Sequence, residues 1–342
     1  MKKILVAMSG GVDSAVAVGL LREAGYEVGG ATMLLRDGGE AEAEEARLAA
    51  GRLDVPFHLF SWKEEFRRAV IEPFAAVYRE GGTPNPCVFC NRALKFGKFL
   101  DEVLRLGYDG MATGHYARVE YAEGRWHLRA ALDTAKDQTY MLYALTQSQL
   151  ARIVLPLGTF DKAQVRAKAA QWGLPQASKH DSQDICFVPG GDYMTYLNVH
   201  GWPPTPGRFV TEDGRDCGAH RGFEGYTVGQ RRGLEIAAGR RIYVVDKRRP
   251  DVVLGESGAL FSRRVAVSDV NWIAGEPPAG PVEGRVKLRY TARAEACRIT
   301  PEGDGASLLF SEPQRAVTVG QAAVFYRDGE VLGGGTITGG AK

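Results

Sequence analysis

The sequence predicts an α/β protein. We expect an N-terminal parallel sheet with helices on both faces, then a small β-rich central domain and a C-terminal β-barrel. Short apolar runs alternate with helical patterns over about the first 200 residues, which is typical of βαβ units. Three prolines at positions 203, 204 and 206 then interrupt the chain, and the strands beyond them are short. The expected domain bounds are 1–200, 201–262 and 263–342.

The N-terminal elements follow from the hydrophobic pattern. Ile4–Met8 is a continuous apolar run, as expected for a parallel strand buried on both faces. The helix after it should end at Gly25, because glycine suits helix C-termini. The predicted strands are Ile4–Met8, Val28–Leu35, Val55–Phe60 and Gly110–Thr113, and the predicted helices are Ala15–Ala24, Glu40–Leu53, Trp62–Tyr78 and Arg92–Leu106.

The remaining chain reads as β-structure. Around Phe209, Tyr243 and Val252, short apolar runs between turn residues indicate the strands of the central domain. The last 80 residues or so predict a small barrel. Its expected strands are Val265–Trp272, Val282–Tyr290, Ala306–Phe310, Ala316–Val319, Ala322–Tyr326 and Val331–Thr338.

The composition is that of an ordinary globular protein, with 342 residues, 44% hydrophobic and 25% charged. No apolar run reaches the roughly 18 residues that span a bilayer, and the N-terminal run is too short for a signal peptide. We therefore expect a cytoplasmic protein without membrane contact. The net charge of +2 is no argument for nucleic acid. Five cysteines, an odd number, argue against a disulfide framework, and Cys217 and Cys297 are expected to be buried free thiols.

The strongest functional signal is the segment Ser9-Gly-Gly-Val-Asp-Ser14 between the first strand and the first helix. Its glycines allow a tight turn, and its N–H groups, its hydroxyls and the helix N-terminus can together hold a phosphate. It lacks the Gly-Lys-Ser/Thr ending of the P-loop and the spacing of the dinucleotide fingerprint. Asp13 would repel phosphates unless it holds Mg²⁺ or orients a donor. The N-terminal domain is therefore predicted to bind a nucleotide, an ordinary glycine turn being the alternative.

Two later segments contain cysteines in settings that suit chemistry. In Thr83-Pro-Asn-Pro-Cys87-Val-Phe-Cys90 the prolines predict a turn before a helix, whose N-terminus would lower the pKa of the Cys90 thiol. Half of a structural zinc site is the alternative, but no second Cys-x-x-Cys exists. Cys186 lies between the polar residues 180–184 and a Pro-Gly pair, which suits an exposed, reactive thiol.

The glycine segment resembles the SGGxDS signature of the ATP pyrophosphatases, which split ATP to AMP and pyrophosphate and so adenylate a substrate carbonyl oxygen. With the cysteine segments, the chain is similar essentially end to end to the tRNA-specific 2-thiouridylases, which thiolate the wobble uridine of tRNA. The shared motifs are the segment 7–14, Asn-Pro-x-x-x-Cys-Asn at 85–91, Thr-Gly-His-Tyr at 113–116, Lys-Asp-Gln-x-Tyr at 136–140, Ser-x-x-Ile-Cys-Phe at 182–187, Gly-Tyr-Thr-x-Gly-Gln-Arg-Arg-Gly-Leu at 225–234 and Arg-Tyr at 289–290.

The resemblance implies roles by position. Cys90 matches the family nucleophile, and Cys186 matches the cysteine that carries a persulfide. The positions that would contact ATP are Ala7, Met8, Ser9, Gly10, Gly11, Val12, Asp13, Ser14, Met33 and Gly114. The pocket of the target base would be lined by Asn85, Pro86 and Cys87, and the tRNA would be contacted by His115, Lys136, Asp137, Gln138, Arg289, Tyr290 and Gln321. Lysine and arginine independently suit phosphate, and tyrosine can stack on an extruded base.

Cys87 is a departure from the family. Many members have aspartate at this position, where it is thought to assist proton transfer. The substitution brings three cysteines near one site, and Cys87, Cys90 and Cys186 would also suit a four-iron, four-sulfur cluster. The resemblance favours a persulfide mechanism, in which Cys90 and Cys186 cycle between persulfide and disulfide. The third thiol favours the cluster, and both hypotheses stay open at this point.

The resemblance thus implies an enzyme that uses ATP and Mg²⁺ to adenylate the uridine C2 oxygen and then transfers sulfur to C2. Its partners would be tRNA, bound at the anticodon loop, and a sulfur-donor protein. An amide-forming ATP pyrophosphatase of the argininosuccinate-synthetase type is the alternative enzyme, and it would need no reactive cysteine. A non-enzymatic RNA-binding module is the third hypothesis.

Overall fold

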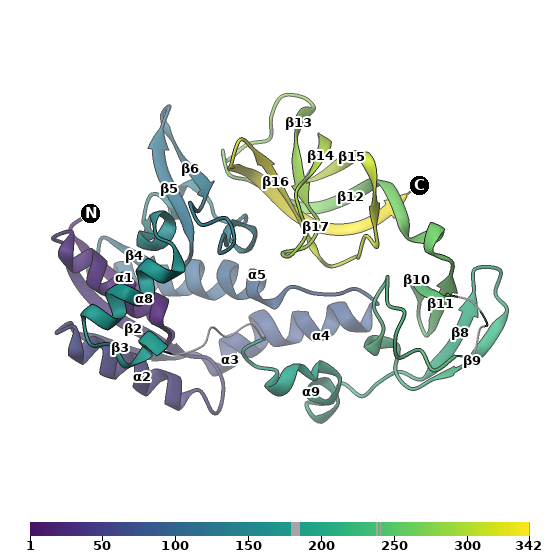
Figure 1. Ribbon diagram of the computed structural model, residues 1–342, viewed down its shortest axis with the longest axis horizontal. Coiled ribbons are helices and arrows are strands. Elements are labelled where there is room, and N and C mark those ends of the chain that lie inside the picture. Colours follow the sequence, from purple (N-terminus) through teal and green to yellow (C-terminus); the bar gives the residue numbers. More distant parts are fainter. Residues whose placement is uncertain (179–184, 237–238, 240, 342) are drawn as a thin grey trace.

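The predicted architecture is confirmed in a computed structural model that describes residues 1–178, 185–236, 239 and 241–341 (Figure 1). The N-terminal sheet is parallel and has the order β3-β2-β1-β4-β7. Its strands are β1 (Lys3–Ala7), β2 (Glu27–Leu34), β3 (Phe57–Ser61), β4 (Gly110–Thr113) and β7 (Ile153–Val154). The strand order reverses between β1 and β4, which is where open α/β sheets bind ligands.

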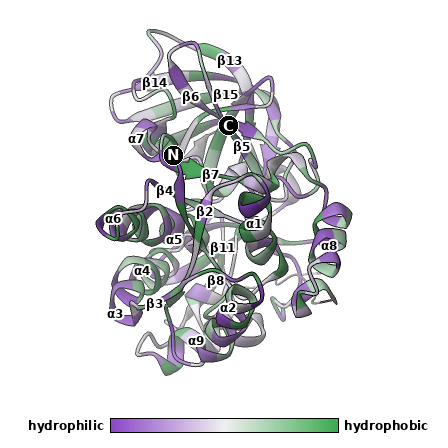
Figure 2. Cartoon of the chain, turned by 90° about the vertical axis from the view of Figure 1, so that its left-hand side faces the viewer, coloured by the Kyte–Doolittle hydropathy of each residue, from purple (hydrophilic) through white to green (hydrophobic). Residues whose placement is uncertain are grey.

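Strand β1 is buried on both faces, as its continuous apolar run predicts. Ile4 and Val6 pack into one hydrophobic cluster, whereas Leu5 and Ala7 pack into another. The first cluster is closed by α1 (Val12–Glu23), α2 (Glu40–Arg52) and α8 (Lys162–Gln171), and the second by η2 (Asn91–Lys98) and α6 (Phe99–Arg105). Figure 2 shows the strands between α6 on one side and α1 with α8 on the other.

Two long helical segments run from the sheet toward the central domain (Figure 1). One comprises α3 (Lys63–Phe66), the π-helical η1 (Arg67–Ile71) and α4 (Glu72–Arg79). The other comprises α5 (Pro86–Cys90), the π-helical η2 and α6. The second segment begins at Pro86 rather than at Arg92, so the predicted start is wrong. Proline is well accommodated at the first helical position, where its missing N–H costs nothing.

The central domain contains one small sheet, of order β10-β11-β8-β9. Its strands are β8 (Gly207–Thr211), β9 (Asp216–His220), β10 (Tyr243–Arg248) and β11 (Asp251–Gly255).

The short helices α7 (Gln147–Leu150) and α9 (Tyr193–Val199) lie outside the sheets, and single 3₁₀ turns occupy Thr139–Met141, Pro156–Thr159, Pro175–Ser178, Pro189–Gly191, Phe223–Gly225 and Ser257–Leu260. Among the described residues, no helix combines the length and apolar character that a membrane span requires.

The six C-terminal strands form a closed barrel, because β12 pairs with both β15 and β17. The strands are β12 (Phe261–Trp272), β13 (Val282–Lys287), β14 (Glu295–Glu302), β15 (Gly305–Arg315), β16 (Ala322–Arg327) and β17 (Glu330–Ala341). The predicted strand at Ala316–Val319 is wrong, and this segment is a loop. Ala316 has a φ of +54°, which a strand cannot accommodate.

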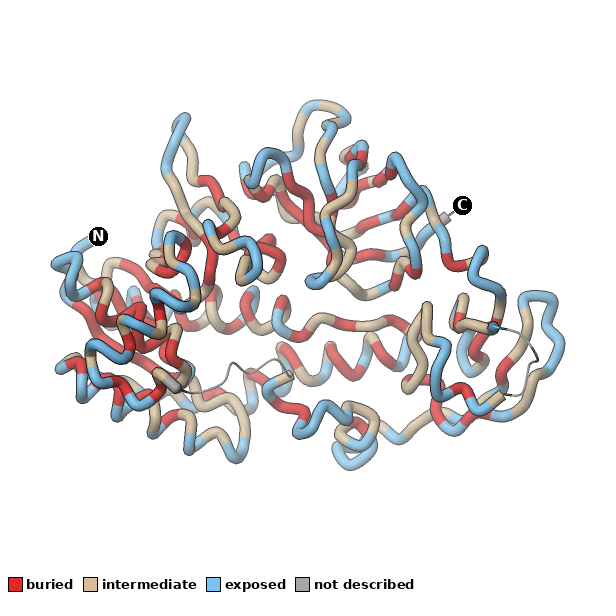
Figure 3. Tube along the Cα trace, in the orientation of Figure 1, coloured by how far each residue is buried: buried red, intermediate tan, exposed pale blue. Residues whose placement is uncertain are grey.

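A hairpin of the N-terminal domain extends the barrel sheet, which the sequence did not predict. Strands β5 (Ala117–Ala122) and β6 (Arg125–Ala130) pair with each other, and β6 pairs with β17 where Arg129 faces Glu330. The amide N–H of Ala130 also donates to the Gly329 carbonyl, with N···O 2.8 Å. The exposed tip of the hairpin points away from the rest of the fold (Figure 3). The barrel and the parallel sheet are therefore joined by backbone pairing.

Candidate active site

The segment Ser9–Ser14 forms the predicted turn between β1 and the N-terminus of α1. Gly10 has a φ of +76°, and a Cβ there would lie 2.6 Å from the Glu42 carbonyl oxygen, so only glycine fits. The Ser14 hydroxyl accepts from the Ser9 N–H at 3.1 Å and donates to the Gly11 carbonyl at 3.1 Å, which ties the turn together. Gly11 is the N-cap of α1 and offers no side-chain acceptor. The first N–H groups of this helix can therefore donate to a ligand bound in the turn.

Gly114 closes the loop from the next strand. A Cβ at Gly114 would lie 2.7 Å from both the Asp13 carbonyl carbon and the Ser14 nitrogen. The backbone after β4 therefore touches the loop after β1, at the point where the strand order reverses. Met33 lies near the end of β2, beside Thr32, whose hydroxyl donates to the Met8 carbonyl at 2.7 Å. The structure brings these predicted nucleotide positions together at the carboxyl edge of the sheet.

Asp13 has partners that the sequence did not reveal. The Lys162 ammonium lies 2.8 Å from both carboxylate oxygens of Asp13, and the Tyr116 hydroxyl donates to one of them at 2.8 Å. The Lys162 side chain is only 15% exposed. The Asp13 carboxylate therefore takes part in an ion pair and a hydrogen bond within the protein. Lys162 and Tyr116 thus join the site. Tyr116 ends the Thr-Gly-His-Tyr motif, whereas no sequence signal marked Lys162, which lies 149 residues from Asp13.

Cys90 and the two neighbours of Cys186, Ile185 and Phe187, belong to one hydrophobic cluster. Cys90 ends α5 and packs against this cluster, which contains Phe187, the residue after Cys186. The Phe187 ring contacts Phe66 and Phe74, with centroids 5.5 and 5.2 Å apart, and this anchors the chain next to Cys186. Cys186 is exposed as predicted, whereas residues 179–184, with the first part of the Ser-x-x-Ile-Cys-Phe motif, lie outside the described residues.

The pKa prediction for Cys90 is wrong. The helix begins at Pro86, so Cys90 lies inside a continuous helical segment rather than at its start. Burial raises the pKa of the Cys90 thiol to about 11, and the nearby Lys95 ammonium opposes the shift. Burial also raises the pKa values of Cys87 and Cys186, although both residues remain exposed to solvent.

Lys95 is the cation common to this site. Its charge lowers the pKa of each of the three thiols against the effect of burial. Lys95 follows Cys90 by five residues in the π-helical segment η2, and π-helical hydrogen bonds join residues five apart. Sequence reasoning missed Lys95, although its spacing from Cys90 was visible.

The described residues do not support the cluster hypothesis. No three or more histidine, cysteine or acidic side chains among them come together in a way that could hold a metal. Cys87, Cys90 and Cys186 are therefore near one another without forming a ready ligand set. All five cysteines are free. Cys297 is buried in the barrel core as predicted, whereas Cys217 is only partly buried.

Several predicted tRNA contacts make hydrogen bonds inside the protein. Gln138 accepts from the Tyr116 N–H at 2.9 Å, and Asp137 accepts from the Thr139 hydroxyl at 2.6 Å. Burial holds the pKa of His115 well below its usual range, and Lys95 lowers it further, so the ring is neutral at pH 7. Gln138 and the neutral His115 therefore present no charge at the site.

The barrel contributes Arg289, Tyr290 and Gln321 from its loops. The Arg289 guanidinium donates to the Ala316 carbonyl at 2.6 Å, and Gln321 donates to the Thr83 carbonyl at 2.9 Å. Tyr290 is 37% exposed. Burial raises the pKa of its phenol, nearby Asp137 and Cys87 raise it further, and nearby Lys136 lowers it. Tyr290 thus lies beside the predicted base pocket. Asn85 in that pocket contacts Met141 Sδ at 3.4 Å.

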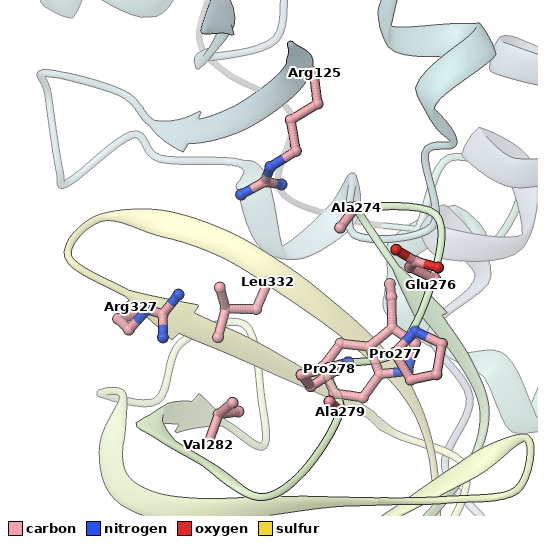
Figure 4. Close-up of a pocket in the computed structure, with 10 residues that line it drawn as sticks. Arg125, Ala274, Glu276, Pro277, Pro278, Ala279, Val282, Arg327 and Leu332 are labelled. Atoms are coloured by element: carbon pink, nitrogen blue, oxygen red, sulfur yellow. The ribbon is translucent and has the colours of Figure 1, made fainter. Parts of the chain in front are cut away.

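A separate pocket of about 430 Å³ lies between the β5–β6 hairpin and the barrel (Figure 4). Arg125 faces it from the hairpin, and Arg327 and Leu332 face it from the barrel (Figure 4). It contains none of the predicted site residues.

Comparison with known proteins covers nearly the whole chain. Residues 2–190 match the family described as tRNA methyl transferase HUP domain, 195–253 the tRNA methyl transferase PRC-barrel domain, and 262–337 the aminomethyltransferase beta-barrel domain. The tRNA-specific 2-thiouridylase MnmA of Carboxydothermus hydrogenoformans is 46% identical over 98% of this chain and 97% of its own. The chain belongs to the tRNA-specific 2-thiouridylase family. The relative of the same name from Chloroflexus aggregans is 47% identical over 98% of both chains.

Membership in the 2-thiouridylase family accounts for both halves of the site. The family resemblance inferred from the motifs is confirmed, and the amide-forming alternative is not favoured. The glycine loop and the predicted cysteines Cys90 and Cys186 all lie within residues 2–190, which match one family model.

Proposed function

We propose that this protein is an ATP-dependent tRNA sulfurtransferase that replaces the C2 oxygen of the wobble uridine with sulfur. The observation that carries the proposal is that the phosphate loop and the Cys90–Cys186 site belong to one α/β domain, in a chain of the 2-thiouridylase family. An amide-forming enzyme would need the loop but not the thiols. An RNA-binding module would need neither.

In the first step, the uridine C2 oxygen attacks the α-phosphorus of ATP. The bond to pyrophosphate breaks, and C2 of the adenylated base becomes electrophilic. The N–H groups of the loop and the helix N-terminus offset negative charge on the phosphates. Lys162 places a cation beside the same loop. Asp13 supplies one carboxylate that would hold Mg²⁺, which neutralises phosphate charge when bound.

In the second step, sulfur moves from Cys186 to the base. A sulfur-donor protein first converts the Cys186 thiol to a persulfide, and its terminal sulfur bonds to C2. The sulfur–sulfur bond of the persulfide breaks as Cys90 sulfur bonds to Cys186 sulfur. AMP then leaves with the former C2 oxygen, and a thiol reductant must reduce the Cys90–Cys186 disulfide before the next turnover.

Cys90 must be deprotonated for this step. In the protein without substrates its pKa of about 11 keeps it protonated at pH 7 to 8. Lys95 is the described cation that favours its thiolate. Cys87 occupies the position of the family aspartate. Because burial also raises the pKa of its thiol, Cys87 does not act as a base at neutral pH, and its role is to line the base pocket.

The tRNA would lie across the cysteine site and the adjoining barrel. Tyr290 supplies an exposed aromatic ring beside Cys87 for an extruded base. Lys136 supplies positive charge close to Tyr290. Extrusion of a base from the anticodon loop costs less than from a duplex, because that loop is single-stranded.

The test is nucleoside mass spectrometry of an unmodified tRNA after incubation with the protein, ATP, Mg²⁺ and a cysteine desulfurase with cysteine. We expect 2-thiouridine at the wobble position and AMP in equal amount. Cys90→Ser and Cys186→Ser should each lose activity at least 10²-fold. Cys217→Ser is the matched control and should stay active, since Cys217 lies in the central domain.

Two results would contradict the proposal. Absence of tRNA-dependent pyrophosphate release would leave an RNA-binding module, and an overall activity that alkylation of the cysteines does not diminish would favour the amide-forming alternative. The same preparation decides between the sulfur chemistries. An iron-free, colourless enzyme that thiolates tRNA supports the persulfide. About four irons per chain, lost with activity in Cys87→Ser, would overturn it.

A further inference from the structure

A loop of the barrel holds the segment that leads into the cysteine helix. This loop, residues 316–321, connects β15 to β16. The Thr83 N–H donates to the Val319 carbonyl with N···O 2.8 Å, and the Gln321 amide nitrogen donates to the Thr83 carbonyl at 2.9 Å. The same Gln321 nitrogen lies 3.4 Å from the Pro84 carbonyl oxygen. Both backbone groups of Thr83 are thus satisfied by residues more than 230 positions away.

The contact is closely packed. Gly320 has a φ of +87°, and a Cβ there would lie 2.6 Å from Val77 Cγ1 and 3.2 Å from the Thr83 nitrogen and oxygen. A Cβ at Gly82 would lie 3.0 Å from the Val319 carbonyl oxygen. No water fits between the loop and the segment at these distances. The Gln321 hydrogen bonds therefore form where the barrel loop and the Thr83 segment are already in direct van der Waals contact.

The loop is itself held at both ends. The Arg289 guanidinium donates to the Ala316 carbonyl at 2.6 Å and lies 3.0 Å from the Thr318 hydroxyl, which is buried. At the other end, the fully buried Tyr140 of the N-terminal domain donates to the Ala322 carbonyl at 2.8 Å. Gln321 is therefore presented from a rigid support.

The segment Thr83–Pro86, which receives these bonds, cannot fix its own conformation through internal backbone hydrogen bonds. Thr83-Pro84-Asn85-Pro86 has a proline at every second position, and proline has no N–H to donate. The carbonyls of Thr83 and Pro84 precede the first turn of α5, so helical bonds do not use them. An outside donor is needed to fix their direction, and Gln321 supplies it.

We infer that Gln321 is a positioning residue for sulfur transfer: through Thr83 and Pro84 it sets the start of α5 and thereby the places of Cys87 and Cys90 relative to the nucleotide loop. This inference rests on the proposed function. It gives the barrel a second role beside holding tRNA, because the active site is complete only when the barrel loop is seated. A displacement of about 1 Å at a reacting group costs on the order of 10²-fold in rate.

A positioning role and a direct tRNA contact have different kinetic signatures. A lost contact to tRNA weakens binding and leaves the rate at saturation unchanged, whereas a lost positioning residue lowers the rate at saturation and leaves binding unchanged. Gln321→Ala and Gln321→Glu both remove the amide donor, and glutamate keeps the size. Gln314→Ala is the matched control, because Gln314 lies on β15 of the same barrel and, among the described residues, its side chain bonds only to the nearby Glu312 carbonyl.

The experiment combines single-turnover thiolation, tRNA binding and amide hydrogen exchange. We expect both Gln321 variants to thiolate about 10- to 10²-fold more slowly at saturating tRNA, with the tRNA Kd within about twofold of wild type. Exchange of the Thr83 amide, measured on peptides covering 78–88, should become about tenfold faster. Gln314→Ala should match wild type in all three.

A variant that binds tRNA tenfold more weakly but reacts at the wild-type rate when saturated would overturn the inference and make Gln321 a tRNA contact. Unchanged exchange at Thr83 would also overturn it. The exchange measurement needs neither tRNA nor ATP. It therefore tests whether Gln321 holds the Thr83 segment even if the thiolation assay contradicts the proposed function. Thermal unfolding of each variant separates a local change from loss of the fold.

Discussion

Gly114→Ala should damage the nucleotide site while leaving the rest of the fold in place. Gly114 follows β4 and touches the loop after β1, the contact that brings the two halves of the site together. A Cβ at this position would lie 2.7 Å from the backbone of Asp13 and Ser14. Backbone atoms cannot rotate away as a side chain can, so the loop itself must move.

The size of the effect follows from this distance. Ordinary van der Waals contact begins near 3.4 Å, so the loop must shift by about 0.7 Å. Overpacking of this kind costs about 1–3 kcal/mol of folding free energy. A shift approaching 1 Å at a reacting group costs on the order of 10²-fold in rate. We therefore expect a folded variant whose tRNA-dependent pyrophosphate release is about 10- to 10²-fold slower.

Urea unfolding gives the stability change, calorimetric titration gives the ATP affinity, and a coupled assay gives pyrophosphate release. Gly51→Ala is the matched control. Gly51 lies in the last turn of α2 with no atom within 4 Å of an added Cβ, so alanine should stabilise the helix by about 0.5–1 kcal/mol and leave catalysis unchanged. If Gly114→Ala binds ATP and releases pyrophosphate like the wild type, the loop is not the nucleotide site.

Three further predictions concern charge in the site. Lys162→Met should raise the KM for ATP about tenfold, because the negative charge of Asp13 then faces the phosphates without a neutralising cation. Lys168→Met on the same helix is the control and should leave the KM unchanged. A wild-type KM for Lys162→Met in an ATP titration would refute this prediction. Asp13→Ala should lose adenylation and, by removing the carboxylate that pairs with Lys162, about 1–3 kcal/mol of unfolding free energy in urea, whereas Asp13→Asn should lose adenylation with a smaller loss of stability. The free Cys90 thiol should react with iodoacetamide about tenfold faster per pH unit from pH 7 to 9, because its pKa is raised to about 11 and the thiolate grows with pH; peptide mass spectrometry that found a plateau below pH 9 would contradict the raised pKa.

The phosphate loop was predictable because its signals are local. A buried strand, two glycines and a helix start follow one another within a dozen residues, and backbone sterics dictate the turn wherever the rest of the chain lies. The position of Cys90 within its helix was not predicted correctly, because prolines precede turns and also occupy first helical positions. Burial then reversed the expected direction of its pKa, and burial depends on neighbours distant in sequence.

Local patterns alone predicted the order of the domains, the glycine loop and the candidate catalytic cysteines. Periodicity, glycine sterics and side-chain identity act over a few residues and can be read along the chain. Only the packed fold decided that Lys162 pairs with Asp13 and that Gln321 holds Thr83, contacts 149 and 238 residues apart. Such pairs form because whole elements pack against one another, and no short stretch of sequence contains both partners. The tertiary structure therefore set the charge balance and positioning of a candidate site whose loop and cysteines were already visible in the sequence.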